Sequence, residues 1–189
     1  MEIKKTTIEG VLLIKQPVYQ DARGYFMESW NQEMFNEALK KQIIFVQDNF
    51  STSVHGVLRG LHYQYPNSQG KLVRVTRGVV HDVIVDIRRN SKTFGQNLII
   101  ELSSENNLQI WMPDGIAHGF LVTSESADFL YKVTSLYDKD SEHCIVWNDE
   151  DLRIPWPLHL LDGDPVVSEK DKLGLSFNLR NGTDPKDVS

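Results

Sequence analysis

Short apolar runs, each closed by a Gly, Asn, Asp or Ser, recur along the chain from residue 11 to residue 137. The regular spacing of these turn-forming residues constrains the fold more than any other feature, because β-branched and aromatic residues between turn formers are typical of strands. Many short strands at such spacing are typical of a β-sandwich or a β-barrel. The sequence therefore predicts an all-β fold.

The clearest predicted strand runs from Val79 to Ile87, where side chains alternate with a period of two. One face would carry His81 with Val79, Val83, Val85 and Ile87, and the other Asp82, Ile84 and Asp86. Only Asn31–Lys41 has the spacing of a helix, with Asn31 as its N-cap. One helix does not cover a parallel sheet, so the helical content should be minor.

Two further segments have a distinct composition. The stretch from Asp151 to Pro165 places prolines among Trp and Leu, which predicts an ordered loop against the core. The tail beyond Leu179 is polar, and we expect it to fray. The chain shows no internal repeat, and its length of 189 residues predicts that residues 1–189 form a single domain.

Charge and composition exclude several partners. The net charge is −6 and the basic residues are scattered, which argues against a nucleic-acid surface. No apolar run approaches the ~20 residues that span a bilayer, so no membrane partner is expected. The single Cys144 and an N-terminus without an apolar core predict a cytoplasmic, reduced protein.

Common catalytic motifs are missing from the sequence. No G-x-G-x-x-G follows a strand, and Gly70-Lys71 lacks the remainder of a phosphate-binding loop. There is no G-x-S-x-G elbow. Cys144 lies in a strand-like CIVW run with no evident activating partner, and we interpret it as a buried, inert side chain.

Polar residues crowd two segments that otherwise have the pattern of strands, GVLRGLHYQYPNSQGK and MPDGIAHGF. Together they look like the paired motifs of a cupin barrel, which in metal-binding members supply His and Glu ligands. Here the first motif offers only His62, since Gln64 takes the place of the second histidine. Lys71 brings an ammonium, which repels a divalent ion, near the place of the carboxylate. A metal-free polar pocket is favoured over a metal site.

Such a pocket suits proton transfer at a carbon beside a ketone. A neutral imidazole, His62, could accept the proton while Lys71 stabilises the enolate oxygen. A phenol, Tyr131, could return a proton from the opposite side. Structural roles compete with each assignment: His62 and Tyr131 could fill the core, Lys71 and Arg59 could be solvated, and Asp171 could cap a loop. Strict alternation along the strand also places the side chains of His62 and Arg59 on opposite faces of the sheet, unless Gly60 marks a bulge.

The ordered motifs resemble those of the dTDP-4-dehydrorhamnose 3,5-epimerases, a family of RmlC-like cupins. They span nearly the whole chain: DARGYFMESW, FVQDNFSTS, GVLRGLHYQ, QGKLVRVTRG, DVIVDIRRNSKTFG, WMPDGIAHGF, FLYKVTSLY, EHCIVWND and SEKD. The resemblance implies a cupin-type double-stranded β-helix, or jelly roll, with minor helices. It also implies a homodimer in which strands cross between subunits, and no metal or redox cofactor.

The resemblance also implies roles for individual residues. His62 of LHYQ would be the proton acceptor and Asp171 of SEKD its partner, while Tyr131 of FLYK would be the proton donor. Lys71 of QGKL would lie near the C4 oxygen. Tyr137 would stack on thymine, and the other positions that hold the sugar nucleotide would be Arg23, Phe26, Glu28, Gln47, Asn49, Arg59, His118, Glu142 and Lys170.

The function that follows is epimerisation at C3 and C5 of dTDP-4-dehydro-6-deoxy-D-glucose, which gives dTDP-4-dehydro-L-rhamnose. The nearest alternative is an epimerase that acts at C3 only or on another keto sugar nucleotide. A non-catalytic sugar-binding cupin would be favoured if His62 and Asp171 lay far apart. A metal-dependent cupin oxygenase is the third alternative.

Overall fold

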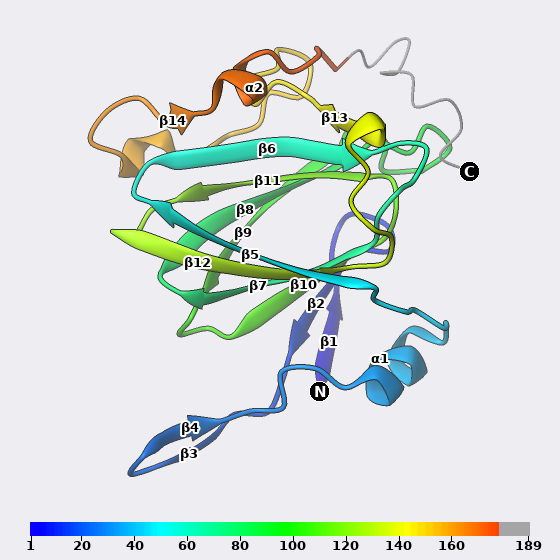
Figure 1. Ribbon diagram of the computed structural model, residues 1–189, viewed down its shortest axis with the longest axis vertical. Helices are drawn as coiled ribbons and strands as arrows, with labels where there is room; N and C mark the ends of the chain where they lie inside the picture. The colour runs from blue at the N-terminus through cyan, green and yellow to red at the C-terminus, as the bar shows by residue number, and fades with distance from the viewer. Residues whose placement is uncertain (178–189) are drawn as a thin grey trace.

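Two antiparallel β-sheets stack face to face in the computed structural model, which describes residues 1–177 (Figure 1). The first sheet has the order β1 (Glu2–Lys5), β2 (Leu12–Lys15), β10 (Leu108–Met112), β7 (Lys71–Arg77), β12 (Ser126–Val133), β5 (Gln47–Val54). The second has the order β13 (Glu142–Cys144), β6 (Val57–Gln64), β11 (Ile116–Val122), β8 (Val79–Asp86), β9 (Asn97–Ser103). The short β14 (Val166–Val167) pairs in parallel with β6.

The remaining elements are small. They comprise the hairpin of β3 (Tyr19–Asp21) and β4 (Gly24–Phe26), two helices, α1 (Gln32–Leu39) and α2 (Glu169–Lys172), and two 3₁₀ turns, Lys139–Ser141 and Leu158–Leu160. The predicted all-β jelly roll with minor helices is confirmed.

The central strands β11 and β8 of the second sheet are buried on both faces, and β8 shows why. Val80 and Ile84 pack in the core between the two sheets. Val83 and Val85 point the other way, into a second apolar cluster on the outer face of the sheet. The predicted alternation of this strand is confirmed, and it places Asp82 on the inner face beside apolar neighbours.

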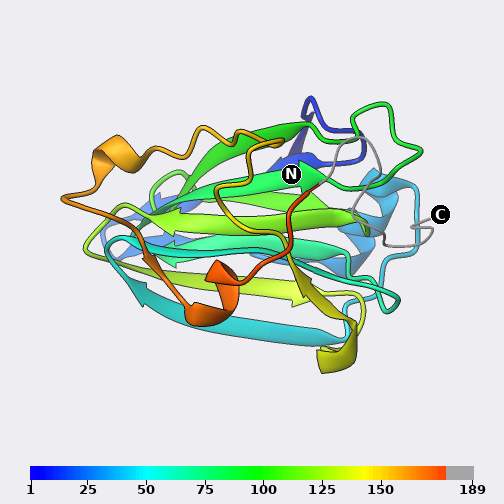
Figure 2. The same cartoon turned by 90° about the horizontal axis from the view of Figure 1, so that it is seen from above.

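A long covering segment, residues 145–177, closes the outer face of the second sheet (Figure 2). Trp156 is 8% exposed, and its indole N–H donates to the carbonyl of Trp147 at 2.7 Å. The buried carboxylate of Asp149 accepts from the backbone N–H groups of Leu152 and Phe177 at 2.9 and 2.7 Å. These contacts confirm the predicted ordered loop; the tail beyond Leu179 lies outside the described residues.

Helix α1 covers the outer face of the first sheet. Asn31 caps it by accepting a hydrogen bond from the backbone N–H of Met34 at 3.1 Å, as the sequence predicts. Phe35 is 1% exposed and packs against Trp30, Phe45 and Trp111. The hairpin β3–β4, by contrast, projects away from both sheets (Figure 1).

A β-bulge at Gly60 sets the direction of the side chains along β6. His62 lies opposite His118 of β11, whereas Arg59 lies opposite Phe120, so three steps on β6 match two on β11. The extra residue turns Arg59 and His62 toward the same cavity. Gly60 has φ +113°, and a Cβ there would lie 2.6 Å from the Cα of Gly119. The bulge that the sequence suggested is confirmed.

Gly60→Ala should lower the free energy of unfolding by about 2 kcal/mol or more, since the new methyl group meets backbone at a conformation that L-residues avoid. Denaturant unfolding followed by circular dichroism measures the change. Gly163→Ala is the matched control, because nothing lies within 4 Å of its Cβ position. Equal midpoints for both variants would contradict the constraint.

Candidate active site

A cavity of about 260 Å³ opens between the two sheets, at the end where β6 and β12 face each other. Three of the predicted catalytic side chains line it: His62, Lys71 and Tyr131. Four predicted substrate-binding residues also line it, namely Arg59, His118, Tyr137 and Glu142. The structure therefore gathers on one surface residues that come from five segments of the chain.

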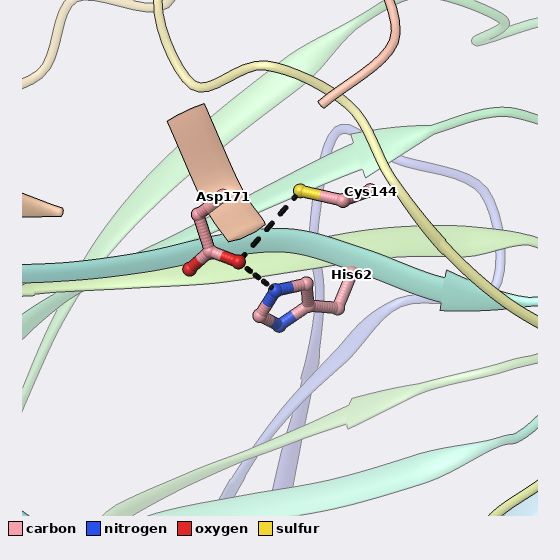
Figure 3. Close-up of side chains that lie close together, drawn as sticks. All are labelled: His62, Cys144 and Asp171. Carbon is pink, nitrogen blue, oxygen red and sulfur yellow. Dashed lines mark hydrogen bonds and ion pairs between the residues drawn. The ribbon is translucent and has the colours of Figure 1, made fainter. Parts of the chain in front are cut away.

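His62 and Asp171 form a hydrogen-bonded pair at the edge of the cavity (Figure 3). The distance from His62 Nε2 to Asp171 Oδ1 is 2.7 Å. The second oxygen of Asp171 accepts from the backbone N–H of Gly60 at 3.2 Å, and the hydroxyl of Ser168 caps the short helix α2 that carries Asp171. The pair that the sequence predicted is therefore assembled across 109 positions of the chain.

The Asp171 carboxylate is buried yet ionised. Its burial alone would raise the pKa, but the hydrogen bond and charge of His62, with the bonds from Gly60 and Ser168, hold the pKa below its ordinary value of 3.8. A carboxylate on one imidazole nitrogen fixes the tautomer of the ring and stabilises the imidazolium. The opposite nitrogen of His62 is thereby kept as a proton acceptor.

Cys144 lies beside this pair, which the sequence did not reveal (Figure 3). We predicted a buried side chain; it is partly exposed, with its sulfur 4.0 Å from Asp171 Oδ1. Burial, with the nearby charge of Asp171, raises the pKa of the thiol to about 12. The group is therefore a neutral thiol, and the interpretation of Cys144 as chemically inert agrees with its surroundings.

Donor atoms of His62, Cys144 and Asp171 lie within 4.8 Å of one another, the spacing of a possible metal site. The set differs from the cupin motif considered above, because the ligands come from β6, β13 and α2. Nε2 of His62 and Oδ1 of Asp171 already bond each other. Gln64 serves another purpose: its side chain bonds the backbone on both sides of Tyr137.

Lys71 is a buried cation on the floor of the cavity. It is 8% exposed, and its ammonium donates to the carbonyl of His62 at 3.4 Å. Burial lowers the pKa of Lys71 from 10.5 to about 8, against the opposing charges of Asp82 and Glu142. A cation in such a site interacts strongly with any negative charge that develops on a bound molecule.

Tyr131 approaches the cavity from β12, in the opposite sheet from His62. Its neighbour across the strand pair is Asn49 of β5. Burial raises the pKa of the Tyr131 phenol, although the charge of Arg59 acts in the other direction. The hydroxyl therefore carries its proton at neutral pH and can act as an acid.

Tyr137 stands at the mouth of the cavity, 54% exposed, with an aromatic face available for stacking. Gln47 accepts a hydrogen bond from its backbone N–H at 3.0 Å, and the Tyr137 hydroxyl donates to Glu142 at 2.8 Å. Lys170 forms an ion pair with the same carboxylate of Glu142. Predicted binding residues from β5, β13 and α2 thus hold one another in place.

Two more predicted binding residues, Arg59 and His118, are held in place by hydrogen bonds to neighbouring side chains. The Arg59 guanidinium donates to the hydroxyl of Ser53 at 3.1 Å. His118 Nε2 lies 2.7 Å from Oδ2 of Asp82, a fully buried carboxylate that sequence analysis placed on the inner face of its strand but assigned no function. The signal was present: a charged residue among the apolar positions of a core strand.

Six predicted binding residues do not line the cavity. Gln47 and Lys170 bond the lining residues Tyr137 and Glu142, and Asn49 bonds Gln47, so these three adjoin the cavity. Arg23, Phe26 and Glu28 lie away from it. Arg23 and Phe26 belong to the projecting hairpin β3–β4, where Arg23 pairs with Asp21 and Phe26 is 70% exposed. Glu28 is exposed in the segment that follows. None of the three is among the residues that line the cavity.

Comparison with known proteins decides the family. A family model described as dTDP-4-dehydrorhamnose 3,5-epimerase matches residues 5–178. The chain belongs to this family. A member from Pseudomonas aeruginosa, dTDP-4-dehydrorhamnose 3,5-epimerase, is 52% identical over 177 residues, which are 94% of this chain and 96% of the relative.

Other members of the dTDP-4-dehydrorhamnose 3,5-epimerase family extend the comparison. The crystal structure of the Legionella pneumophila 3,5-epimerase in complex with dTDP-4-keto-L-rhamnose matches with a TM-score of 0.88 at 47% identity, covering 93% of this chain and 92% of that one. A dTDP-4-dehydrorhamnose 3-epimerase from Streptomyces niveus is 35% identical over 176 residues, or 93% of this chain and 83% of the relative. Among the described residues, no helix is long and apolar enough to cross a membrane.

The pKa of Lys71 predicts a distinct titration. In protein with ¹³C-labelled lysine, the Lys71 resonance should titrate near pH 8, while exposed lysines titrate near their ordinary value of about 10.4. Lys71 is charged below that midpoint and neutral above it. NMR measures the titration, and loss of the resonance in Lys71→Arg assigns it. A midpoint above 10 would contradict the burial of the charge.

Proposed function

We propose that this member of the family catalyses epimerisation at C3 and C5 of dTDP-4-dehydro-6-deoxy-D-glucose, giving dTDP-4-dehydro-L-rhamnose. The observation that carries the proposal is the pairing of His62 with Asp171 at a cavity that also holds Lys71 and Tyr131. A base, a buried cation and an acid are the groups that inversion beside a ketone requires. A purely sugar-binding cupin would not need the 2.7 Å pair.

In the first step, His62 removes the proton from the carbon next to the C4 ketone. The electron pair of the broken C–H bond moves into the ring, and negative charge collects on the C4 oxygen. Lys71 would stabilise that oxygen, supplying the charge that a metal ion supplies in other enzymes. Asp171 stabilises the imidazolium that forms.

In the second step, Tyr131 donates its proton to the same carbon from the opposite face. The two groups come from opposing sheets, His62 from β6 and Tyr131 from β12. A proton removed on one side and returned on the other inverts the centre. The steps move only protons, so the proposed reaction consumes no oxidant or reductant.

The nucleotide half of the substrate would occupy the mouth of the cavity. The Tyr137 ring offers a stacking surface for the base, and Arg59 offers a guanidinium fork for diphosphate oxygens. The other groups proposed to hold this half are Gln47, Asn49, His118, Glu142 and Lys170. We place the reaction in the cytoplasm, where Cys144 remains a free thiol; cell fractionation would test this location.

Deuterated water separates the two proton transfers. With the dTDP keto sugar as substrate, His62→Ala should abolish both deuterium uptake and inversion. Tyr131→Phe should retain uptake, because enolate formation needs only the base and the cation, while inverted product falls sharply. NMR of the sugar follows the label at C3 and C5 separately from their configuration.

The same experiment contains its controls. Label at C3 without label at C5 would mean a 3-epimerase, and no uptake by the wild type would remove the proposed function. Cys144→Ala is the matched variant for His62→Ala, since it removes a neighbouring side chain without a role in the reaction. If Tyr131→Phe inverts both centres at the wild-type rate, Tyr131 is not the donor.

We also propose that the enzyme is a homodimer that exchanges strands between subunits. The projecting hairpin exposes Tyr19, Tyr25 and Phe26 at 65%, 54% and 70%, and the edge strand β5 exposes Phe50 and Val54 at 61% and 62%. Apolar surface of this kind favours association. A second copy would carry Arg23, Phe26 and Glu28 to the cavity that they do not reach in one chain.

Complementation tests the exchange. Arg23→Ala and His62→Ala should each be nearly inactive alone, whereas co-expressed chains should regain up to about a quarter of the wild-type activity, because half of the mixed dimers' sites are intact in a statistical mixture. Light scattering measures the oligomeric state. Activity that stays at the level of the single variants would mean that Arg23 acts on its own subunit.

A further inference from the structure

Asp82 is a buried carboxylate beneath the cavity for which the reaction above has no role. It is fully buried on β8, and its Oδ2 lies 2.7 Å from Nε2 of His118, whose side chain is 9% exposed. Its other oxygen, Oδ1, has no hydrogen-bond partner within residues 1–177. A buried carboxylate with one oxygen unbonded costs folding free energy, so its presence beneath the cavity calls for a physical reason.

The second partner of Asp82 is electrostatic. Among the carboxylates that act on Lys71, Asp82 has the largest effect, and it opposes the loss of the Lys71 proton. Burial raises the pKa of Asp82 itself, while the charges of His118 and Lys71 act against that rise. The structure places the three groups together: Lys71 and His118, each 8% exposed, line the same cavity, and Asp82 bonds His118 from the neighbouring strand β8.

The surroundings of Lys71 distinguish Asp82 from other charges. The titratable groups that share its cavity are Arg59, His62, Tyr63, His118, Tyr131, Tyr137 and Glu142. Of these, only Glu142 is a carboxylate, and it already bonds Lys170 and Tyr137. Asp82 is thus the countercharge available from beneath the cavity floor.

We propose that Asp82 is a positioning residue: it fixes the ring of His118 through Nε2 and supplies the countercharge that keeps Lys71 protonated in the cavity. The proposal rests on the function above, in which Lys71 stabilises the C4 oxygen. With Nε2–H bonded to Asp82, Nδ1 of His118 remains for a bound molecule, since no described residue bonds it. The charge of Asp82 thereby sets the highest pH at which Lys71 remains an ammonium.

The sign of the effect follows from the charge. An anion nearby favours the ammonium, so removing it lowers the pKa of Lys71. A reaction that needs the ammonium is lost as the pH rises through that pKa. Removal of Asp82 should therefore move the alkaline limb of the kcat profile to lower pH.

Asp82→Asn keeps the size of the side chain and an acceptor for His118 but removes the charge. In this variant the midpoint of the alkaline limb of the kcat profile and the NMR midpoint of Lys71 should both fall by about one pH unit or more. Asp86→Asn is the matched control: it lies on the same strand and is also fully buried, but it pairs with Arg88, away from the cavity. The control should leave both midpoints unchanged, whatever its effect on stability.

Further measurements separate positioning from a structural role. Asp82→Glu, which restores the charge, should return both midpoints toward the wild-type values. In Lys71→Arg the guanidinium does not titrate, so any alkaline limb that remains belongs to another group, and adding Asp82→Asn should not shift it. A folded Asp82→Asn with wild-type midpoints would overturn the proposal.

The wild-type protein provides a test that needs no variant. In ¹⁵N-histidine spectra, His118 should have its proton on Nε2, and a proton on Nδ1 alone would overturn the proposal even if Asp82→Asn does not fold. The NMR midpoints need no substrate. Failure of the proposed function would leave them as predicted, whereas failure of this inference would leave turnover intact and the midpoints unmoved.

Discussion

The hydrogen bonds of Asp171 to β6 join the covering segment of the chain to the cavity, and the chemistry of the site depends on them. One oxygen meets Nε2 of His62 and the other meets the backbone N–H of Gly60. The segment that delivers Asp171 is itself anchored by the buried Asp149, which accepts from Phe177. Loss of that anchor would leave His62 in the sheet but without the carboxylate that fixes its tautomer.

The same architecture explains why charges survive in the interior. Both groups are buried between the two sheets, and this burial disfavours the ammonium of Lys71 and the carboxylate of Asp82. Each group offsets part of the other's cost, and His118 adds a hydrogen bond. Charged side chains take the place of apolar packing at this point of the core. They are already in position to interact with a charge that forms on a bound ligand.

Most of the fold could be predicted from local sequence patterns. The strand β8 and the capped helix at Asn31 could be predicted because periodicity and capping are properties of neighbouring residues. The distance between His62 and Asp171 could not, because it depends on how a distant segment packs; resemblance to a family supplied that pairing. The surroundings of Cys144 and Asp82 were missed for the same reason, since their partners, Asp171 on α2 and His118 on β11, lie in other elements of the fold.

The bulge at Gly60 links the two halves of the proposed substrate site. Under strict alternation, Arg59 and His62 would point to opposite faces of β6, and a molecule that touched one could not touch the other. One extra residue brings both into the cavity, and it fits only because Gly119 on β11 also lacks a side chain. The pair of glycines therefore sets the spacing between Arg59, which we propose holds the nucleotide, and His62, the proposed base.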